Sequence, residues 1–346
     1  MIFEGEITML TSQELDMLAR IDHTQAKNDL FLEICVAYLN ELETLVSAEI
    51  INEITSGDKR LEERAFSRFL SSTFIEDTAL EEQMHAEYFS PSIKRLDPQE
   101  YKSNPYFKNI PIKNEKIGAW TLSYQTYKPY EGFVRDDFTL FDDFREVCNI
   151  GFFDEEFSFP TVFENGTEWM AIKPNEIETM RAPIDSAKGN VIAFGLGMGY
   201  FAYMASLKDD VSSVTVVEKS KDAISLFKSH ILPYFENKEK IKIIEADAFE
   251  YVKGEMSSQG YDYAFVDLWH DTSDGTELYI KMKKLEHLCK NTRFEYWIEK
   301  SILVTIRKRI FNAIMESIEN GKNTLSYNEI IDRLSFKCLR ELVKLL

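Results

Sequence analysis

Short apolar runs alternate with helix-like segments through the second half of the sequence. We expect strands at 190–195, 213–218, 241–245, 261–267 and 293–298. Apolar residues at three-and-four spacing predict helices at 199–208, 220–232, 247–253, 276–290 and 300–319. Strands that are joined by helices of this length form parallel sheets. The sequence therefore predicts an α/β domain with a Rossmann-like, doubly wound parallel sheet.

The first of these strands runs directly into three glycines. The stretch VIAFGLGMGYFAYMAS begins at Val191 and carries Gly195, Gly197 and Gly199. Glycine has no Cβ, so a ligand can approach this backbone closely, and the helix that follows offers free N–H groups. A dinucleotide-binding loop would have its third glycine at position 200, where the chain has Tyr200. The G-x-G-x-G spacing therefore favours a different ligand at this turn.

An acidic residue stands at the end of each of the next three strands. Glu218 ends the second strand, Asp247 follows the third, and Asp267 ends the fourth. Ligands of open parallel sheets bind beyond the carboxyl ends of the strands, where the strand order reverses. A carboxylate at Glu218 can accept hydrogen bonds from both hydroxyls of a ribose. The alternative is that these acids are ordinary polar residues at strand ends.

Together these features resemble the class I S-adenosylmethionine-dependent methyltransferases, over residues 167–298. The resemblance implies that S-adenosylmethionine is the cofactor and that Glu218 binds its ribose. It implies that Asp247 or Ala248 reads the adenine amino group and that Asp267 lies beside the ligand. The loop beside the methionine part would be Phe194, Gly195, Leu196, Gly197, Met198 and Gly199.

Two further features bear on this resemblance. In these enzymes the segment before the glycine loop often closes over the cofactor; here it carries Asn175 and Glu176, which a helix start explains equally well. After residue 298 the sequence becomes helical, whereas most of the family ends its sheet with an antiparallel hairpin. We therefore expect five strands in the order 3-2-1-4-5, without the terminal hairpin.

Two alternatives to methyl transfer remain. The small β region ahead of the parallel sheet is similar to that of the spermidine synthase-like aminopropyltransferases, and a polyamine would suit an acidic surface. Their loop normally has an acidic residue, as in GGGDGG, where this chain has Met198. The other alternative is a non-catalytic scaffold protein that retains the fold.

The segment DLWHDTSD, after the fourth predicted strand, holds the candidate catalytic groups. A nucleophile with a proton to lose needs a base nearby. We expect His270 to be this base, with Asp271 to orient it and Asp267 close by; a surface histidine is the alternative. Asp267, Asp271 and Asp274 would be possible Mg²⁺ ligands, but the acidic–Asn pair that completes such sites is not evident, and we expect no metal. Trp269 stacks on a planar ligand or packs in the core.

The first half of the chain is expected to be helical and then β-rich. Helices are expected within 11–90, the main one beginning at Asn28 or Asp29 and ending at Ser56 and Gly57, with others at 59–70 and 76–88. Four prolines between 91 and 111 predict a linker with little regular structure. The strand-like stretches within 117–172 are AWTLSYQTY, EVCNIGFF and TEWMAI, with a hairpin turn at ENG.

These patterns predict three parts. They are a helical and small-β N-terminal domain at 1–165, a cofactor-binding domain at 166–320 and a helical tail at 321–346. Acidic runs such as Asp136-Asp137 are expected in solvated loops, and the N-terminal helices are a possible homo-oligomer contact.

Composition limits the partners and the compartment. The net charge of −19 repels polyphosphate, so nucleic-acid binding is not expected. We expect neither a membrane span nor a signal peptide. The four cysteines are far apart and form no CxxC pair, which favours a reducing, cytoplasmic location. The partner is an unknown methyl acceptor.

Overall fold

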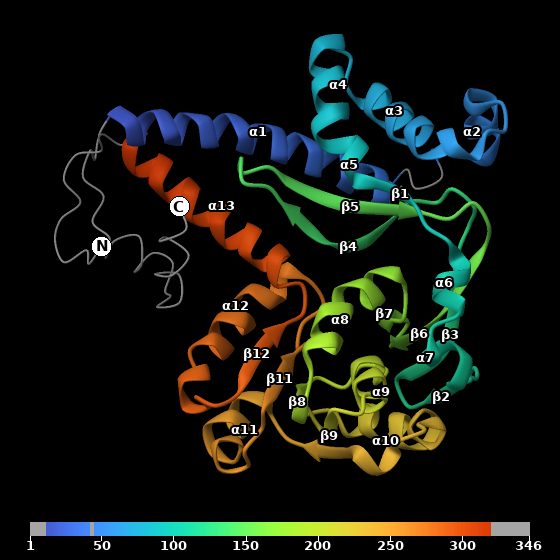
Figure 1. Cartoon of the computed structure of the whole chain (residues 1–346), viewed down its shortest axis with the longest axis vertical. Coiled ribbons are helices and arrows are strands. Elements are labelled where there is room, and N and C mark those ends of the chain that lie inside the picture. The colour runs from blue at the N-terminus through green and yellow to red at the C-terminus, as the bar shows by residue number, and fades with distance from the viewer. Residues whose placement is uncertain (1–11, 42–44, 320–346) are drawn as a thin grey trace.

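A five-stranded sheet, parallel throughout, forms the centre of the second half of the molecule (Figure 1). The computed structural model describes residues 12–41 and 45–319. The strand order is β10-β9-β8-β11-β12. The bounds are β8(Gly189–Phe194), β9(Val211–Glu218), β10(Ile241–Glu245), β11(Tyr263–Val266) and β12(Arg293–Tyr296). The chain moves from β8 outward to β10 and then crosses back to β11, so the strand order reverses between β8 and β11.

Each strand leads into a helix, as a doubly wound α/β fold requires. The helices are α8(Pro174–Ser186), α9(Tyr200–Ser206), α10(Lys221–His230), α11(Ala248–Gly254), α12(Thr272–Lys283) and α13(Glu299–Glu319). The expectation that the fourth helix begins at residue 276 is wrong, because Asp271 and Asp274 form a capping box that begins α12 at Thr272. The predicted tail at 321–346 lies outside the described residues.

The N-terminal helices differ from the expected pattern. The bounds are α1(Ser12–Glu41), α2(Ala48–Thr55), α3(Glu62–Phe74), α4(Thr78–Met84) and α5(Ser90–Ser92). One helix from residue 28 to 56 was expected, but the structure has two, because Ser47 caps a new helix by accepting from the N–H of Ile50. Asn28 lies inside α1; its side chain donates to the carbonyl of Phe144 and accepts from the Tyr88 hydroxyl.

The proline-rich stretch at 91–111 is also more regular than expected. It contains β1(Ile93–Arg95), α6(Pro98–Lys102) and α7(Pro105–Asn109). Pro98 and Pro105 stand in the first turns of α6 and α7, directly after the N-caps Asp97 and Asn104. Proline in the first turn removes an N–H that has no partner there, so these prolines begin helices.

Two small sheets precede the parallel one. The first, in the order β2-β3-β6-β7, is antiparallel and consists of β2(Glu115–Ile117), β3(Trp120–Tyr127), β6(Phe157–Glu164) and β7(Thr167–Ala171). The second, β1-β5-β4, adds β4(Phe133–Leu140) and β5(Glu146–Phe152). The expected turn at ENG is confirmed: Asn165 and Gly166 both have positive φ, as a two-residue hairpin turn requires. The strands β2, β4 and β6 were not expected from the sequence.

The hydrophobic core is divided between these sheets. One cluster of buried residues combines the parallel sheet with the β2-β3-β6-β7 sheet. The other packs the N-terminal helices against β1 and β5. In β8, Val191, Ile192 and Phe194 are fully buried, as the continuous apolar run predicts for a central parallel strand.

The prediction that Asp136-Asp137 lies in a solvated loop is wrong. Both residues belong to β4, and Asp137 caps α13: it accepts from the backbone N–H groups of Lys300 (3.0 Å) and Ser301 (2.9 Å) and from the Ser301 hydroxyl. A carboxylate at a helix N-terminus also interacts favourably with the helix dipole. One aspartate thus joins the β1-β5-β4 sheet to the helix that follows the last parallel strand.

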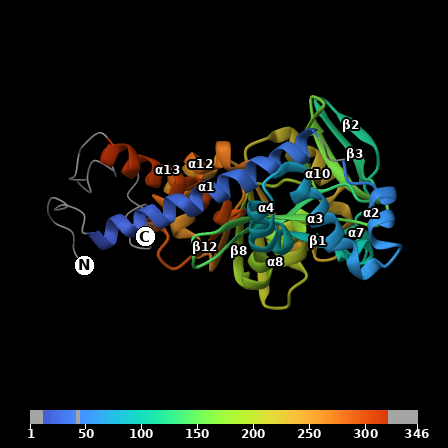
Figure 2. The ribbon, with the colours of Figure 1, turned by 90° about the horizontal axis from the view of Figure 1, so that it is seen from above.

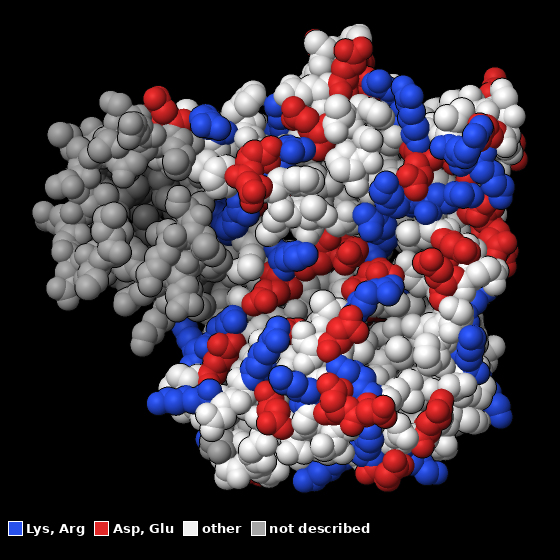
Figure 3. Space-filling view, viewed as in Figure 1, with Lys and Arg blue, Asp and Glu red and all other residues white. Residues whose placement is uncertain are grey.

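The helices α1 and α13 lie close together at one side of the molecule, as both ribbon views show (Figures 1 and 2). An ion pair of 2.6 Å joins Lys308 of α13 to Asp29 of α1. On the face drawn in Figure 3, basic and acidic side chains are interspersed over the described surface. None of the helices in the described ranges has the length and apolar character that a membrane span needs.

Candidate functional site

A cavity of about 380 Å³ lies at the carboxyl end of the parallel sheet. It is lined by residues from the ends of β8, β9, β10 and β11, and from β7 and the start of α8. Eight of the predicted site residues line it: Gly195, Leu196, Gly197, Glu218, Asp247, Ala248, Asp267 and His270. We call it the donor pocket, after the role that we propose for it below. It lies where the strand order reverses, the usual position of ligands in open α/β sheets.

Four predicted site residues do not line the donor pocket. Phe194 and Met198 are fully buried, and Gly199 faces the ring of Phe227. Phe194 contributes its carbonyl, which accepts from the N–H of Asp267 at 2.9 Å and aligns the ends of β8 and β11. The fourth, Asp271, lines a neighbouring cavity.

The glycines of the loop make room mainly for the protein itself, which corrects the sequence interpretation. Gly195 has φ +98°, and a Cβ there would overlap the carbonyl oxygen of Asp267. A Cβ at Gly197 (φ +48°) would overlap the sulfur of Met170, and one at Gly199 (φ +72°) the ring of Phe227. Gly195 and Gly199 therefore require glycine for both their φ angles and their neighbours, whereas at Gly197 the positive φ is the reason, because the Met170 side chain can move.

Met170, on β7, occupies the space that the sequence assigned to the ligand beside Gly197. Its sulfur accepts a hydrogen bond of 3.1 Å from the N–H of Met198. The side chain lines the donor pocket and is only half-buried. A methionine side chain is unbranched and changes conformation easily. Met170 therefore narrows the pocket at the glycine loop without sealing it.

Glu218 is held firmly at the end of β9. Its Oε2 accepts from the N–H of Leu196 at 3.1 Å, and its Oε1 accepts from the N–H of Ser220 at 2.7 Å. The first bond links the end of β9 to the glycine loop. Each carboxylate oxygen has a second lone pair, so these bonds leave acceptor capacity for a ligand.

Asp247 has a structural role at the same edge. It caps α11: its Oδ1 accepts from the N–H groups of Phe249 (2.9 Å) and Glu250 (3.0 Å). These bonds use one of its two oxygens. Ala248, the first residue of α11, is buried in the pocket wall.

The donor pocket is strongly acidic. Six carboxyl groups line it against two lysines, Lys173 and Lys219. The acids are Glu168, Glu176, Glu218, Asp247, Asp267 and Asp274. Burial, followed by the negative charges of Glu176 and Glu218, raises the pKa of Asp267 well above its usual value. Burial raises the pKa of Glu176 to about 7, against the opposing effect of Lys173. A cation in this pocket would restore the charged form of both acids.

His270 is oriented by a different aspartate from the one expected. Its Nδ1 lies 3.2 Å from Oδ2 of Asp274, and Asp274 also accepts from the backbone N–H of His270. Asp271 instead accepts from the N–H of Ser273 and caps α12. The expected pair of His270 with Asp271 is therefore wrong. The His270 ring also contacts Trp169 edge-on, with ring centres 4.3 Å apart.

The remaining aromatic residue of this segment, Trp269, is mostly packed in the core. It lies against Gly275 and stacks on Tyr296, with ring centres 6.4 Å apart, although it also lines the donor pocket. Asp271 and Asp274 are both used in the α12 capping box. Within the described ranges, no three His, Cys, Asp or Glu residues are gathered as metal ligands.

Sequence reasoning missed the contribution of β7 to the pocket and left that of α8 open. Met170 had no local signal, because its contact with Gly197 joins β7 to the loop that follows β8. Glu176 was weighed only as a possible contact, yet it is 7% exposed and lines the pocket beside Asp267. The sequence did carry a signal for this burial, because Glu176 stands on a helix face that is otherwise apolar, where Ile177 and Met180 are also buried.

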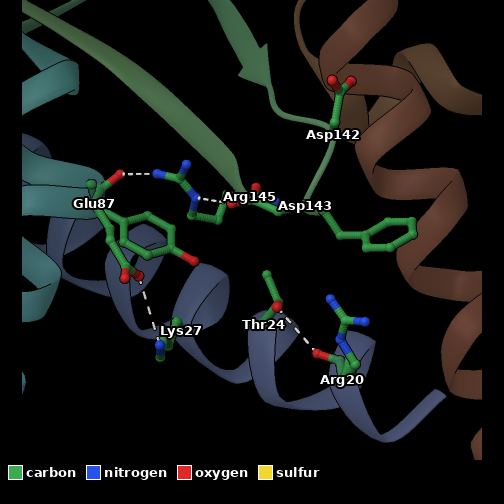
Figure 4. A pocket seen from close by; sticks show the side chains of 9 residues that line it. Arg20, Thr24, Lys27, Glu87, Asp142, Asp143 and Arg145 are labelled. Carbon is green, nitrogen blue, oxygen red and sulfur yellow. Dashed lines mark hydrogen bonds and ion pairs between the residues drawn. The ribbon is translucent and has the colours of Figure 1, made fainter. Parts of the chain in front are cut away.

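A separate cavity of about 320 Å³ lies between α1 and the turn that joins β4 and β5 (Figure 4). Its charged groups largely pair with one another. Lys27 lies 3.7 Å from Glu87, and Arg145 bonds both Asp143 and the Glu87 carbonyl. None of its lining residues belongs to the donor pocket.

Comparisons with known proteins give only distant similarities. No family model matches the sequence, and neither does any curated protein. Among solved structures, spermidine synthase from Thermotoga maritima aligns with a TM-score of 0.28 and 16% identity, over 35% of this chain and 44% of that one.

Two further solved structures align at a similar level. A conserved hypothetical protein from Streptococcus pyogenes gives a TM-score of 0.24 and 16% identity, over 29% of this chain and 59% of that one. A proposed O-methyltransferase from Klebsiella pneumoniae gives 0.23 and 13%, over 30% and 44%. The chain thus spans less than two thirds of each of them, and TM-scores this low carry no argument about family or activity.

Proposed function

We propose that this chain is an S-adenosylmethionine-dependent methyltransferase whose methyl donor binds in the donor pocket. The observation that supports this most directly is Glu218, a carboxylate held by the N–H of Leu196 at the mouth of the glycine loop. It stands on the strand next to the loop, where a ribose can be bound through both hydroxyls. The acidic lining of the pocket suits the positive sulfonium of the donor.

The protein's share of the chemistry is modest. The sulfonium is a strong electrophile, so the chain must position donor and acceptor and remove a proton where the acceptor carries one. His270 is the candidate base, because Asp274 holds its Nδ1 and leaves Nε2 for the acceptor. Replacing His270 with Ala should leave donor binding unchanged and slow transfer by about 10²-fold or more.

Met170 is the side chain that would have to move if the donor's methionine part binds beside Gly197. Its sulfur accepts from the loop N–H of Met198, beside Gly197. Met170→Ala removes the obstruction and should strengthen binding of S-adenosylmethionine if the donor's methionine part lies there.

Calorimetry with S-adenosylmethionine tests the proposal directly. Glu218→Ala should weaken binding by about 1–3 kcal/mol, because the ribose loses hydrogen bonds to a charged group. Glu245→Ala is the matched control: Glu245 is the register partner of Glu218 on β10, but it is exposed and does not line the pocket. Equal affinity of the two variants would remove Glu218 from the site. If neither the wild type nor Met170→Ala binds S-adenosylmethionine at about 1 mM, the methyltransferase proposal fails; if the decarboxylated form does not bind either, a non-catalytic role is favoured.

The acidity of the pocket favours one second candidate, aminopropyl transfer from decarboxylated S-adenosylmethionine. That donor lacks the carboxylate and is therefore more positive, which suits six acids against two lysines. Tighter binding of the decarboxylated compound in the same calorimeter would favour this candidate over methyl transfer.

A further inference from the structure

A larger cavity, of about 590 Å³, adjoins the donor pocket. Both cavities are lined by Lys173, Asn175, His270 and Trp297, so they meet at these four residues. The larger one extends from there to α1, β4 and the start of α13. The candidate base thus stands between two spaces, and the second space is where a methyl acceptor would approach it.

The walls of the larger cavity are mainly apolar. Helix α1 contributes Leu32, Val36 and Leu39, and β4 contributes Phe133 and Val134. Val36 is 49% exposed and Val134 is 37% exposed, so the cavity reaches solvent beside them. Such exposed apolar side chains at a cavity are typical of sites that take apolar ligands.

The charges of this cavity are predominantly negative. Among the described residues, its acids are Glu131, Asp136, Asp137 and Asp271, and its lysine is Lys173. Asp137 and Asp271 are engaged as helix caps. Asp136 is half-buried in the wall, where burial raises its pKa; its Oδ1 accepts from the N–H of its neighbour Asp137.

We propose that this space is the acceptor cavity and that the acceptor is a lipophilic amine, an apolar body that carries an ammonium group. The inference rests on the proposed function. Apolar walls from α1 and β4 would hold the body, and the carboxyl of Asp136 would attract the ammonium. The same acids would repel a ligand that carries a carboxylate.

The reaction balances with the groups at hand. The ammonium first gives one proton to Nε2 of His270, while Asp274 holds Nδ1. The lone pair of the amine then attacks the methyl carbon, the carbon–sulfur bond breaks, and its electron pair stays on the sulfur. The products are a methylammonium and S-adenosylhomocysteine, and His270 returns its proton to solvent.

The test measures binding of three small molecules that share one ring and differ in charge. Tryptamine is a cation, tryptophol is neutral and indole-3-acetate is an anion. Calorimetry without the methyl donor should show tryptamine binding at least about tenfold tighter than indole-3-acetate, with tryptophol between them. Asp136→Asn should remove most of the difference between tryptamine and tryptophol.

The site is located with a pair of matched tryptophan variants. Val36→Trp fills the cavity at its solvent-exposed side and should weaken tryptamine binding at least about tenfold. Ile54→Trp, at an equally exposed position on α2 that lies outside this cavity, should bind as the wild type does. Val134→Trp, from β4, repeats the test should Val36→Trp fail to fold.

The two proposals fail in different ways. S-adenosylmethionine should bind Val36→Trp as it binds the wild type, because Val36 does not line the donor pocket. The acceptor proposal is overturned if tryptamine does not bind, binds no tighter than indole-3-acetate, or binds Val36→Trp equally well. If tryptamine binding depends on Val36 but S-adenosylmethionine does not bind, the amine-binding site is supported and the methyltransferase proposal is refuted.

Discussion

The buried carboxyl of Glu176 makes the stability of this protein depend on pH. Glu176 lies in the first turn of α8, is 7% exposed and lines the donor pocket. Burial raises its pKa from 4.5 to about 7. The folded protein therefore holds a proton on this group in a pH range where the unfolded chain has already released it. Replacing Glu176 with Gln removes that titration while keeping the size of the side chain.

The sign and size of the effect follow from linkage. Below the unfolded pKa both states are protonated and the group has no effect on the pH dependence. As pH rises from about 4.5 towards 7, the unfolded chain releases this proton while the folded state keeps it, so the free energy of unfolding falls; above about 7 both states are ionised and the fall levels off. A difference of about 2.5 pKa units corresponds to about 3 kcal/mol. Between pH 4 and pH 8, Glu176→Gln should therefore gain about 3 kcal/mol relative to the wild type.

Urea unfolding at several pH values across this range measures the difference. Glu156→Gln, in an exposed loop, is the control. The same variant also reports on the pocket: cation binding favours ionised Glu176, so affinity of the wild type for S-adenosylmethionine should rise from pH 6 to pH 8 and that of Glu176→Gln should rise less. If the stability curves of Glu176→Gln and wild type remain parallel across the range, the reasoning from burial is wrong.

Three further substitutions test other parts of the structure. Gly195→Ala should lower the free energy of unfolding in urea by about 2–4 kcal/mol, because its Cβ overlaps a backbone carbonyl at positive φ. The control Gly254→Ala has open space around it and should change the same free energy by less than about 1 kcal/mol. Similar values for the two variants would contradict the close approach of β8 and β11. Asp137→Ala should cost about 1–2 kcal/mol and speed hydrogen exchange at the Ser301 amide; unchanged exchange would mean that the cap contributes nothing. Asp247→Ala should cost about 1 kcal/mol in thermal unfolding through loss of the α11 cap, and an unaltered midpoint would show that the cap is dispensable.

The parallel sheet was predictable because its signals are local. The run from Val191 to Phe194 is apolar at every position, as a strand buried on both faces must be. The glycine loop and Glu218 follow from their places at strand ends, and the structure brings both to one cavity. These features depend on residues that are near in sequence or on a general rule of α/β topology.

What could not be predicted depends on contacts between distant segments. Met170 lies against Gly197 only because β7 returns to the edge of the donor pocket. Asp271 and Asp274 both lie in reach of His270 along the chain, and only the capping box of α12 decides that Asp274 is the partner. Asp137 was expected in a loop because acidic pairs are usually solvated; its helix partner is more than 160 residues away.

The cap that Asp137 provides to α13 also fixes the geometry between the two cavities. Its neighbour Asp136 stands in the acceptor wall, while α13 begins directly after Trp297 and Ile298, which follow the last parallel strand. Because a single carboxylate anchors strand and helix together, lengthening or shortening the connecting loops should leave the position of Asp136 relative to the start of α13 unaltered. Substitutions of the cavity-wall residues on α1 could then change the shape of the cavity while this junction between β4 and α13 stays fixed.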